Sequence, residues 1–76
     1  MVTIYTRTNC PWCTKLKSYL KNNNIIYNEI NITTNEDGFN YMKQISNQSG
    51  VPITDINGTI VIGYDKSSID KLLNIE

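Results

Sequence analysis

Two cysteines separated by two residues form the most reactive feature of the sequence, in the run Cys10-Pro11-Trp12-Cys13. A bridge between them closes so short a loop that it adds little to the stability of a fold, so we interpret them first as chemical groups. A thiolate is the nucleophile of disulfide exchange, and this spacing brings the second sulfur within bonding reach of the first. The pair can therefore attack a disulfide and then close on itself, which releases a reduced substrate.

The same spacing also occurs in metal sites, where it supplies two of the ligands. The chain holds two cysteines and no histidine, so it cannot by itself complete a four-ligand zinc site, and Cys–His and Ser–His nucleophile pairs are excluded. A second hypothesis is an iron–sulfur or zinc site shared between chains, and a third is a small domain without redox activity. The sequence favours thiol–disulfide exchange without a metal ion.

The segments around the cysteines predict that they lie where a strand passes into a helix. Val2–Thr6 is β-branched and aromatic throughout, which is typical of a strand. A helix is predicted from Pro11 to about Lys21, because apolar residues recur there at helical spacing: Trp12, Leu16, Tyr19 and Leu20. At a helix N-terminus, unpaired N–H groups and the helix dipole stabilise a thiolate. Arg7, together with Lys15 or Lys17, can add positive charge.

The rest of the chain predicts two more helices and three more strands. Strands are expected over 25–30, 53–56 and 59–62, the last two joined by the hairpin turn Asn57-Gly58. One helix should follow a cap at Thr34 or Asn35 and end near Ser46 or Asn47, and another should follow Asp65, with Ile69, Leu72 and Leu73 facing inward. The order β-α-β-α-β-β-α predicts an α/β fold, a four-stranded mixed sheet with helices on both faces.

Length and charge exclude several classes of protein. With 76 residues the chain is expected to form one domain over 1–76. Seven basic and seven acidic residues cancel, which gives no basic excess for binding nucleic acid. No apolar run approaches the ~20 residues of a membrane span, and no export signal is visible. We therefore expect a small cytoplasmic protein, monomeric, that binds neither nucleic acid nor membrane.

Three motifs occur along the chain at wide intervals: Tyr5-Thr6-Arg7-Thr8-Asn9-Cys10-Pro11-Trp12-Cys13, Gly50-Val51-Pro52 and Gly63-Tyr64-Asp65. Together they resemble the glutaredoxin family, and within it the small glutaredoxin-like proteins of bacteria and archaea. The resemblance covers essentially the whole chain, including the order of its elements. It implies a thioredoxin-like fold and a dithiol oxidoreductase that reduces protein disulfides or glutathione mixed disulfides.

The resemblance also implies a role for each matching residue. Cys10 would attack and Cys13 would resolve the mixed disulfide. Arg7 would lie near the thiolate and the glycine carboxylate of glutathione. Val51-Pro52 would carry a cis peptide bond and offer its backbone to a bound peptide. Tyr64-Asp65 would meet a γ-glutamyl carboxylate at a helix N-terminus, which is a natural anion site.

Four positions depart from the family pattern: Trp12, Gly50, Ile53 and Ile62, the last replacing the first glycine of a Gly-Gly pair. These departures predict weak or ordinary glutathione activity. Trp12 is expected to be partly exposed, as an apolar contact for the protein whose disulfide is attacked. The chain ends without the Trp-Ser-Gly-Phe-Arg-Pro segment of the redoxins that serve ribonucleotide reductase. Either glutathione, as a co-substrate that is not tightly bound, or a thioredoxin reductase is expected to donate electrons. The alternative function is a binding module that holds an iron–sulfur cluster between two chains through Cys10 and glutathione.

Overall fold

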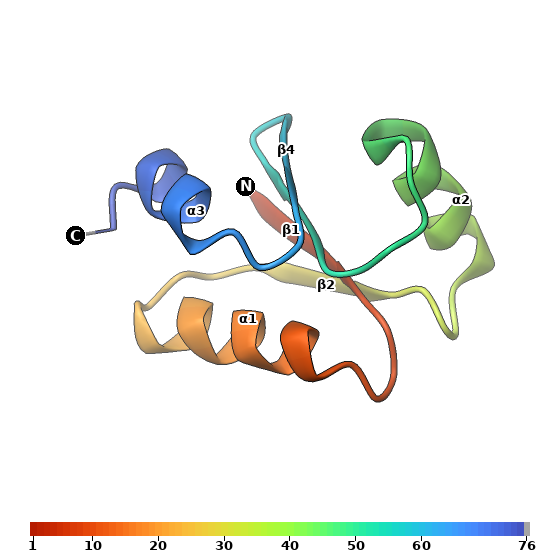
Figure 1. Cartoon of the computed structure of the whole chain (residues 1–76), viewed down its shortest axis with the longest axis horizontal. Helices are drawn as coiled ribbons and strands as arrows, with labels where there is room; N and C mark the ends of the chain where they lie inside the picture. Colours follow the sequence, from red (N-terminus) through yellow and green to blue (C-terminus); the bar gives the residue numbers. More distant parts are fainter. Residues whose placement is uncertain (76) are drawn as a thin grey trace.

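The seven predicted elements are all present, in the predicted order. A computed structural model describes residues 1–75 (Figure 1). Its elements are β1 (Val2–Thr6), α1 (Pro11–Asn22), β2 (Asn28–Asn31), α2 (Glu36–Ser46), β3 (Ile53–Ile56), β4 (Thr59–Ile62) and α3 (Lys66–Leu73). None of the helices in this range is long and apolar enough to cross a membrane.

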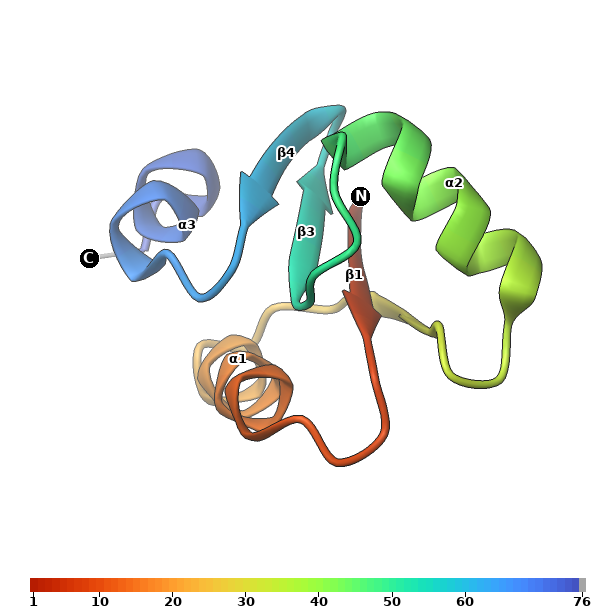
Figure 2. The same cartoon turned by 45° about the vertical axis from the view of Figure 1, so that its right-hand side comes forward.

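The four strands form one mixed sheet in the order β2-β1-β3-β4. Strand β1 runs parallel to β2 and antiparallel to β3, which in turn pairs antiparallel with β4. Helices α1 and α3 cover one face of the sheet and α2 covers the other (Figure 2). The predicted thioredoxin-like α/β fold is confirmed.

Alternation along β1 supplies both halves of the core, because successive strand side chains point to opposite faces. Ile4 packs on one face with Leu16 and Leu20 of α1 and with Ile69 of α3. Tyr5 packs on the other face, in the cluster that also contains Met42, Ile53 and Ile32. The sheet thus holds the start of α1 at the end of β1, where the cysteines lie.

Two local predictions were wrong. The strand expected over 25–30 is shorter and shifted, and Ile26 is 91 % exposed. The reason is register: Asn28 lies opposite Thr3 near the beginning of β1, so the residues before Asn28 have little strand left to pair with. Leu72 was expected to face inward but is 39 % exposed, because α3 packs through Ile69 and Leu73.

Candidate active site

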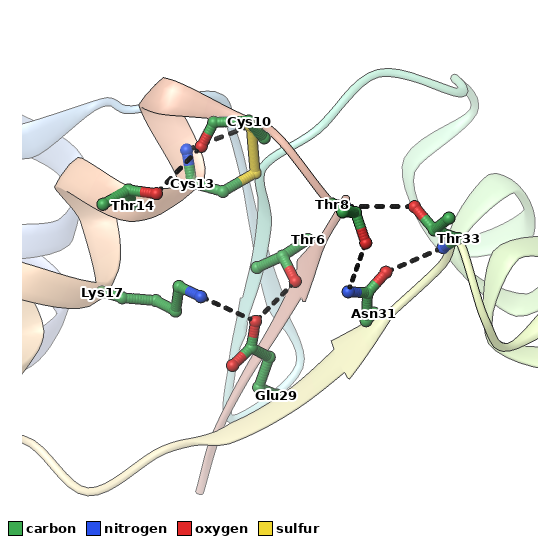
Figure 3. A network of polar contacts seen from close by, with 9 residues as sticks. All are labelled: Thr6, Thr8, Cys10, Cys13, Thr14, Lys17, Glu29, Asn31 and Thr33. Carbon is green, nitrogen blue, oxygen red and sulfur yellow. Dashed lines mark hydrogen bonds and ion pairs between the residues drawn. A yellow bond between two sulfur atoms is a disulfide. The ribbon is translucent and has the colours of Figure 1, made fainter.

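The loop before Cys10 is fixed by hydrogen bonds to the connection between β2 and α2 (Figure 3). The backbone N–H of Thr8 donates to the hydroxyl of Thr33 at 3.1 Å. The Asn31 amide donates to the hydroxyl of Thr8 at 3.2 Å, and its oxygen accepts the N–H of Thr33 at 2.9 Å. This network holds the segment that carries the first cysteine against the sheet.

Cys10 is the N-cap of α1. Its backbone is extended, with φ −115° and ψ 104°, and its sulfur accepts the backbone N–H of Cys13 at 3.1 Å. Its carbonyl accepts the N–H of Thr14 at 3.1 Å, which begins the helix. The expectation that a free N–H of the first turn meets the Cys10 sulfur is confirmed. In this position the helix dipole and the donated N–H both favour a negatively charged sulfur.

The two cysteines differ in their exposure to solvent. The structure joins Cys10 and Cys13 by a disulfide, with the Cα atoms 5.2 Å apart (Figure 3). Cys13 is 1 % exposed, whereas Cys10 is half-buried. An incoming disulfide can therefore reach Cys10 more readily than Cys13.

A charged cluster that the sequence did not indicate lies between α1 and β2. The carboxylate of Glu29 accepts the Thr6 hydroxyl at 2.7 Å and pairs with the Lys17 ammonium at 3.1 Å (Figure 3). The Thr6 hydrogen bond, followed by the Lys17 hydrogen bond and charge, holds the pKa of Glu29 below its ordinary value. The charge of Lys17 is therefore compensated. The available signal was that Glu29 is the one charged residue in the predicted strand 25–30.

A groove of about 300 Å³ brings together four of the residues singled out from the sequence. It is lined by Trp12, Val51, Pro52 and Tyr64, together with Gly63. The Val51–Pro52 peptide bond is cis, as predicted. Trp12 is 55 % exposed, and its ring centroid lies 5.9 Å from that of Tyr64. The Lys15 ammonium lies 4.5 Å from the centroid of the Trp12 ring.

Asp65 and Arg7 are not part of this groove. Asp65 caps α3, where its carboxylate accepts the backbone N–H of Ser68 at 3.2 Å and the Ser68 hydroxyl at 2.8 Å. These bonds, the hydroxyl's first, lower the pKa of Asp65. Arg7 is exposed on the loop after β1 and forms no ion pair within residues 1–75. Ile53 is wholly buried among the residues under α2, so the expectation that its side chain weakens glutathione contacts was wrong.

Comparison with known proteins agrees with this geometry. The model of the family "Glutaredoxin" matches residues 2–61. The chain belongs to the glutaredoxin family. A glutaredoxin-like 8.6 kDa protein in the rubredoxin operon of Clostridium pasteurianum is 42 % identical to it over 73 residues, which cover 96 % of this chain and 97 % of that one.

Solved structures show the same fold. A mutant of the thioredoxin-like protein BC3987 superposes with a TM-score of 0.94 at 29 % identity, covering 99 % of this chain and 96 % of that one. A buckwheat glutaredoxin in complex with glutathione superposes with a TM-score of 0.78 at 22 % identity, covering 96 % and 73 %. The fold and the Cys10–Cys13 pair make this glutaredoxin a thiol redox protein.

Proposed function

We propose that this glutaredoxin is a dithiol oxidoreductase that reduces protein disulfides or glutathione mixed disulfides. Cys10 is the attacking residue and Cys13 the resolving residue. The observation that carries the proposal is the difference between the two sulfurs. Cys10 is half-buried and its sulfur accepts an N–H of the first helical turn, whereas Cys13 is buried.

The reduced protein would act in two exchange steps. The Cys10 thiolate attacks one sulfur of the substrate disulfide, forms a mixed disulfide and expels the other sulfur as a thiolate, which takes up a proton. The Cys13 thiolate then attacks the Cys10 sulfur, which breaks the mixed disulfide and releases the second substrate thiol. The protein is left with the Cys10–Cys13 disulfide, and two electrons have passed to the substrate. An external thiol donor must then reduce that disulfide.

The groove beside Trp12 is our candidate for the substrate contact. The Val51 backbone next to the cis bond, the Trp12 ring and the Tyr64 ring would receive the residues that flank the target sulfur. The buckwheat relative binds glutathione, which supports glutathione as a co-substrate here. Arg7 and the start of α3 at Asp65 would then meet its two carboxylates.

One experiment separates the donors and the competing functions. The oxidised protein is supplied with NADPH and either glutathione with glutathione reductase or a thioredoxin reductase, and reduction of insulin is followed. We expect turnover with at least one donor system. The absence of turnover with both systems, in a protein whose two thiols titrate normally, would contradict the proposal. Iron in the purified protein would instead favour a cluster-binding module.

A further inference from the structure

Strand β4 has a free edge. Within residues 1–75 it pairs with β3 and with no other strand. The backbone N–H of Gly63 donates to the carbonyl of Pro52 at 2.8 Å, so the backbone groups of Gly63 point toward the β3 side of the ladder. Since such bonds recur at every second residue of an antiparallel pair, Thr59 and Val61 bond toward β3. The N–H and C=O groups of Ile60 and Ile62 therefore point outward, where another strand could pair with them.

A groove of about 390 Å³ runs along this edge. All four residues of β4 line it, and Lys71 and Leu72 of α3 contribute to the opposite wall. Ile62 is 55 % exposed and Leu72 is 39 % exposed, so the groove presents two large apolar side chains to solvent. Both views show α3 beside β4, and Figure 2 shows that it lies on the side away from β3 (Figures 1 and 2).

This edge groove and the groove that contains Trp12 are lined by residues that follow one another in the chain. Ile62, at its end, is followed directly by Gly63 and Tyr64, which line the groove that contains Trp12. A four-residue strand spans about 13 Å, at ~3.3 Å for each residue. A ligand that occupies both grooves must therefore extend for several residues beyond the sulfur that reacts.

We propose that an extended segment of the disulfide-containing substrate protein pairs with the free edge of β4 and places an apolar side chain against Ile62 and Leu72. The proposal rests on the function proposed above and specifies its substrate class. Main-chain hydrogen bonds to Ile60 and Ile62 would align the segment, and the apolar contact would select among substrates. Glutathione, a tripeptide, has too few residues to pair along the whole of β4.

Synthetic peptides test this surface. Each peptide carries one cysteine in a mixed disulfide with a small thiol, and a four-residue extended segment follows or precedes this cysteine. The segment is rich in valine in one peptide and rich in serine in the other. The reduced protein is assayed for kcat/KM with each peptide. We expect the valine-rich peptide to react about fivefold faster, because burying an aliphatic side chain contributes on the order of 1 kcal/mol or more. Methylating a backbone nitrogen of the peptide that pairs with β4 should lower kcat/KM by a similar factor.

Two matched substitutions locate the effect. Ile62→Thr keeps a β-branched residue at an exposed strand position and should bring the ratio of the two kcat/KM values close to one. Ile26→Thr makes the same change at an isoleucine that is 91 % exposed and lies outside both grooves, and it should leave the ratio unchanged.

The outcomes distinguish the two proposals. Reduction of both peptides at equal rates by the unmodified protein would overturn strand pairing at β4 and leave the oxidoreductase intact. Equal loss of the preference in both variants would also overturn it. Failure to reduce any peptide, with both thiols titratable, would instead contradict the oxidoreductase function.

Discussion

Helices α1 and α3 begin with the same cap geometry built from different side chains. At α1 the sulfur of Cys10 accepts the N–H of Cys13 at 3.1 Å, and at α3 a carboxylate oxygen of Asp65 accepts the N–H of Ser68 at 3.2 Å. In each case the donor is the third residue after the cap, which is the usual N-cap bond. The backbone therefore offers the same stabilisation of negative charge in both places.

The difference lies in what the cap side chain can do. The Asp65 carboxylate also accepts the Ser68 hydroxyl at 2.8 Å, so both of its hydrogen bonds stabilise the first turn of α3. The Cys10 sulfur can ionise, attack a disulfide or bond to Cys13, and the cap favours the ionised form. A helix start therefore becomes a redox site when its cap residue is a nucleophile and a second sulfur lies one turn further along the helix.

The cysteine substitutions should have the largest effect. Cys10→Ser keeps an oxygen cap on α1 and should abolish disulfide reduction, since no attacking sulfur remains. Cys13→Ser should stop turnover on protein disulfides and trap adducts on Cys10, and should spare exchange that depends on glutathione. Mass spectrometry after exposure to a disulfide substrate locates the adducts. Adducts forming on Cys13 in Cys10→Ser as readily as on Cys10 in Cys13→Ser would contradict the assignment.

The connection into α3 should control glutathione activity. Ile62 is the exposed residue that replaces a family glycine just before Gly63 and Tyr64. Ile62→Gly should open the backbone there and raise kcat/KM with a glutathione mixed disulfide several-fold. Ile26→Gly introduces glycine at another exposed isoleucine and serves as the control. Native activity equal to that of a standard glutaredoxin would show that Ile62 does not limit this reaction.

The charges of Glu29 and Lys17 should affect how readily the Cys10 thiol ionises at the start of α1. Lys17 lies one helical turn after Cys13 and is neutralised by Glu29. Glu29→Gln removes a negative charge and releases a positive one, so the Cys10 thiolate should form at lower pH. Lys17→Met leaves Glu29 uncompensated and should act in the opposite direction. Alkylation of reduced protein as a function of pH measures both changes, which we expect to be a few tenths of a pH unit. Shifts of the same sign in the two variants would contradict an electrostatic cause.

Substitution of the N-cap residue of α3 should change the thermal stability of the protein, and this is the smallest of the expected effects. The Ser68 contacts hold the pKa of Asp65 below its ordinary value of 3.8. A carboxyl group whose pKa is lowered by folding stabilises the protein above its unfolded-state pKa, and this contribution is lost as the pH falls through its folded-state value. Asp65→Ala should therefore lower Tm by a few degrees at neutral pH and by less in strong acid.

Asp65→Asn provides the matched control, because it keeps the oxygen that accepts the Ser68 N–H, as Asn35 does at the start of α2. Its loss of Tm at neutral pH should be smaller than that of the alanine variant. A loss equal to that of Asp65→Ala would show that the charge, and not the cap hydrogen bond, stabilises α3. Thermal unfolding followed by circular dichroism at several pH values measures these differences.

Local signals in the sequence were sufficient to predict four of the elements. The β-branched run gives β1, Pro11 and the apolar spacing give α1, and Asn57-Gly58 joins β3 to β4, so all four elements agree with the prediction to within one residue. The position of the cysteines at the start of α1 followed from the same signals. The cis bond at Val51–Pro52 came from the family resemblance, because few X-Pro bonds are cis.

Which of two similar residues is exposed to solvent depends on tertiary packing. Ile53 and Ile62 are directly opposite each other on neighbouring strands, yet Ile53 is 0 % exposed and Ile62 is 55 % exposed. Ile53 lies on a central strand among the residues that pack under α2, whereas Ile62 lies on the edge strand beside an open groove. Exposure depends on what covers a strand, and the covering helix comes from a distant part of the chain. The pairing of Glu29 with Lys17 is likewise decided by the packing of α1 on the sheet, which no local pattern encodes.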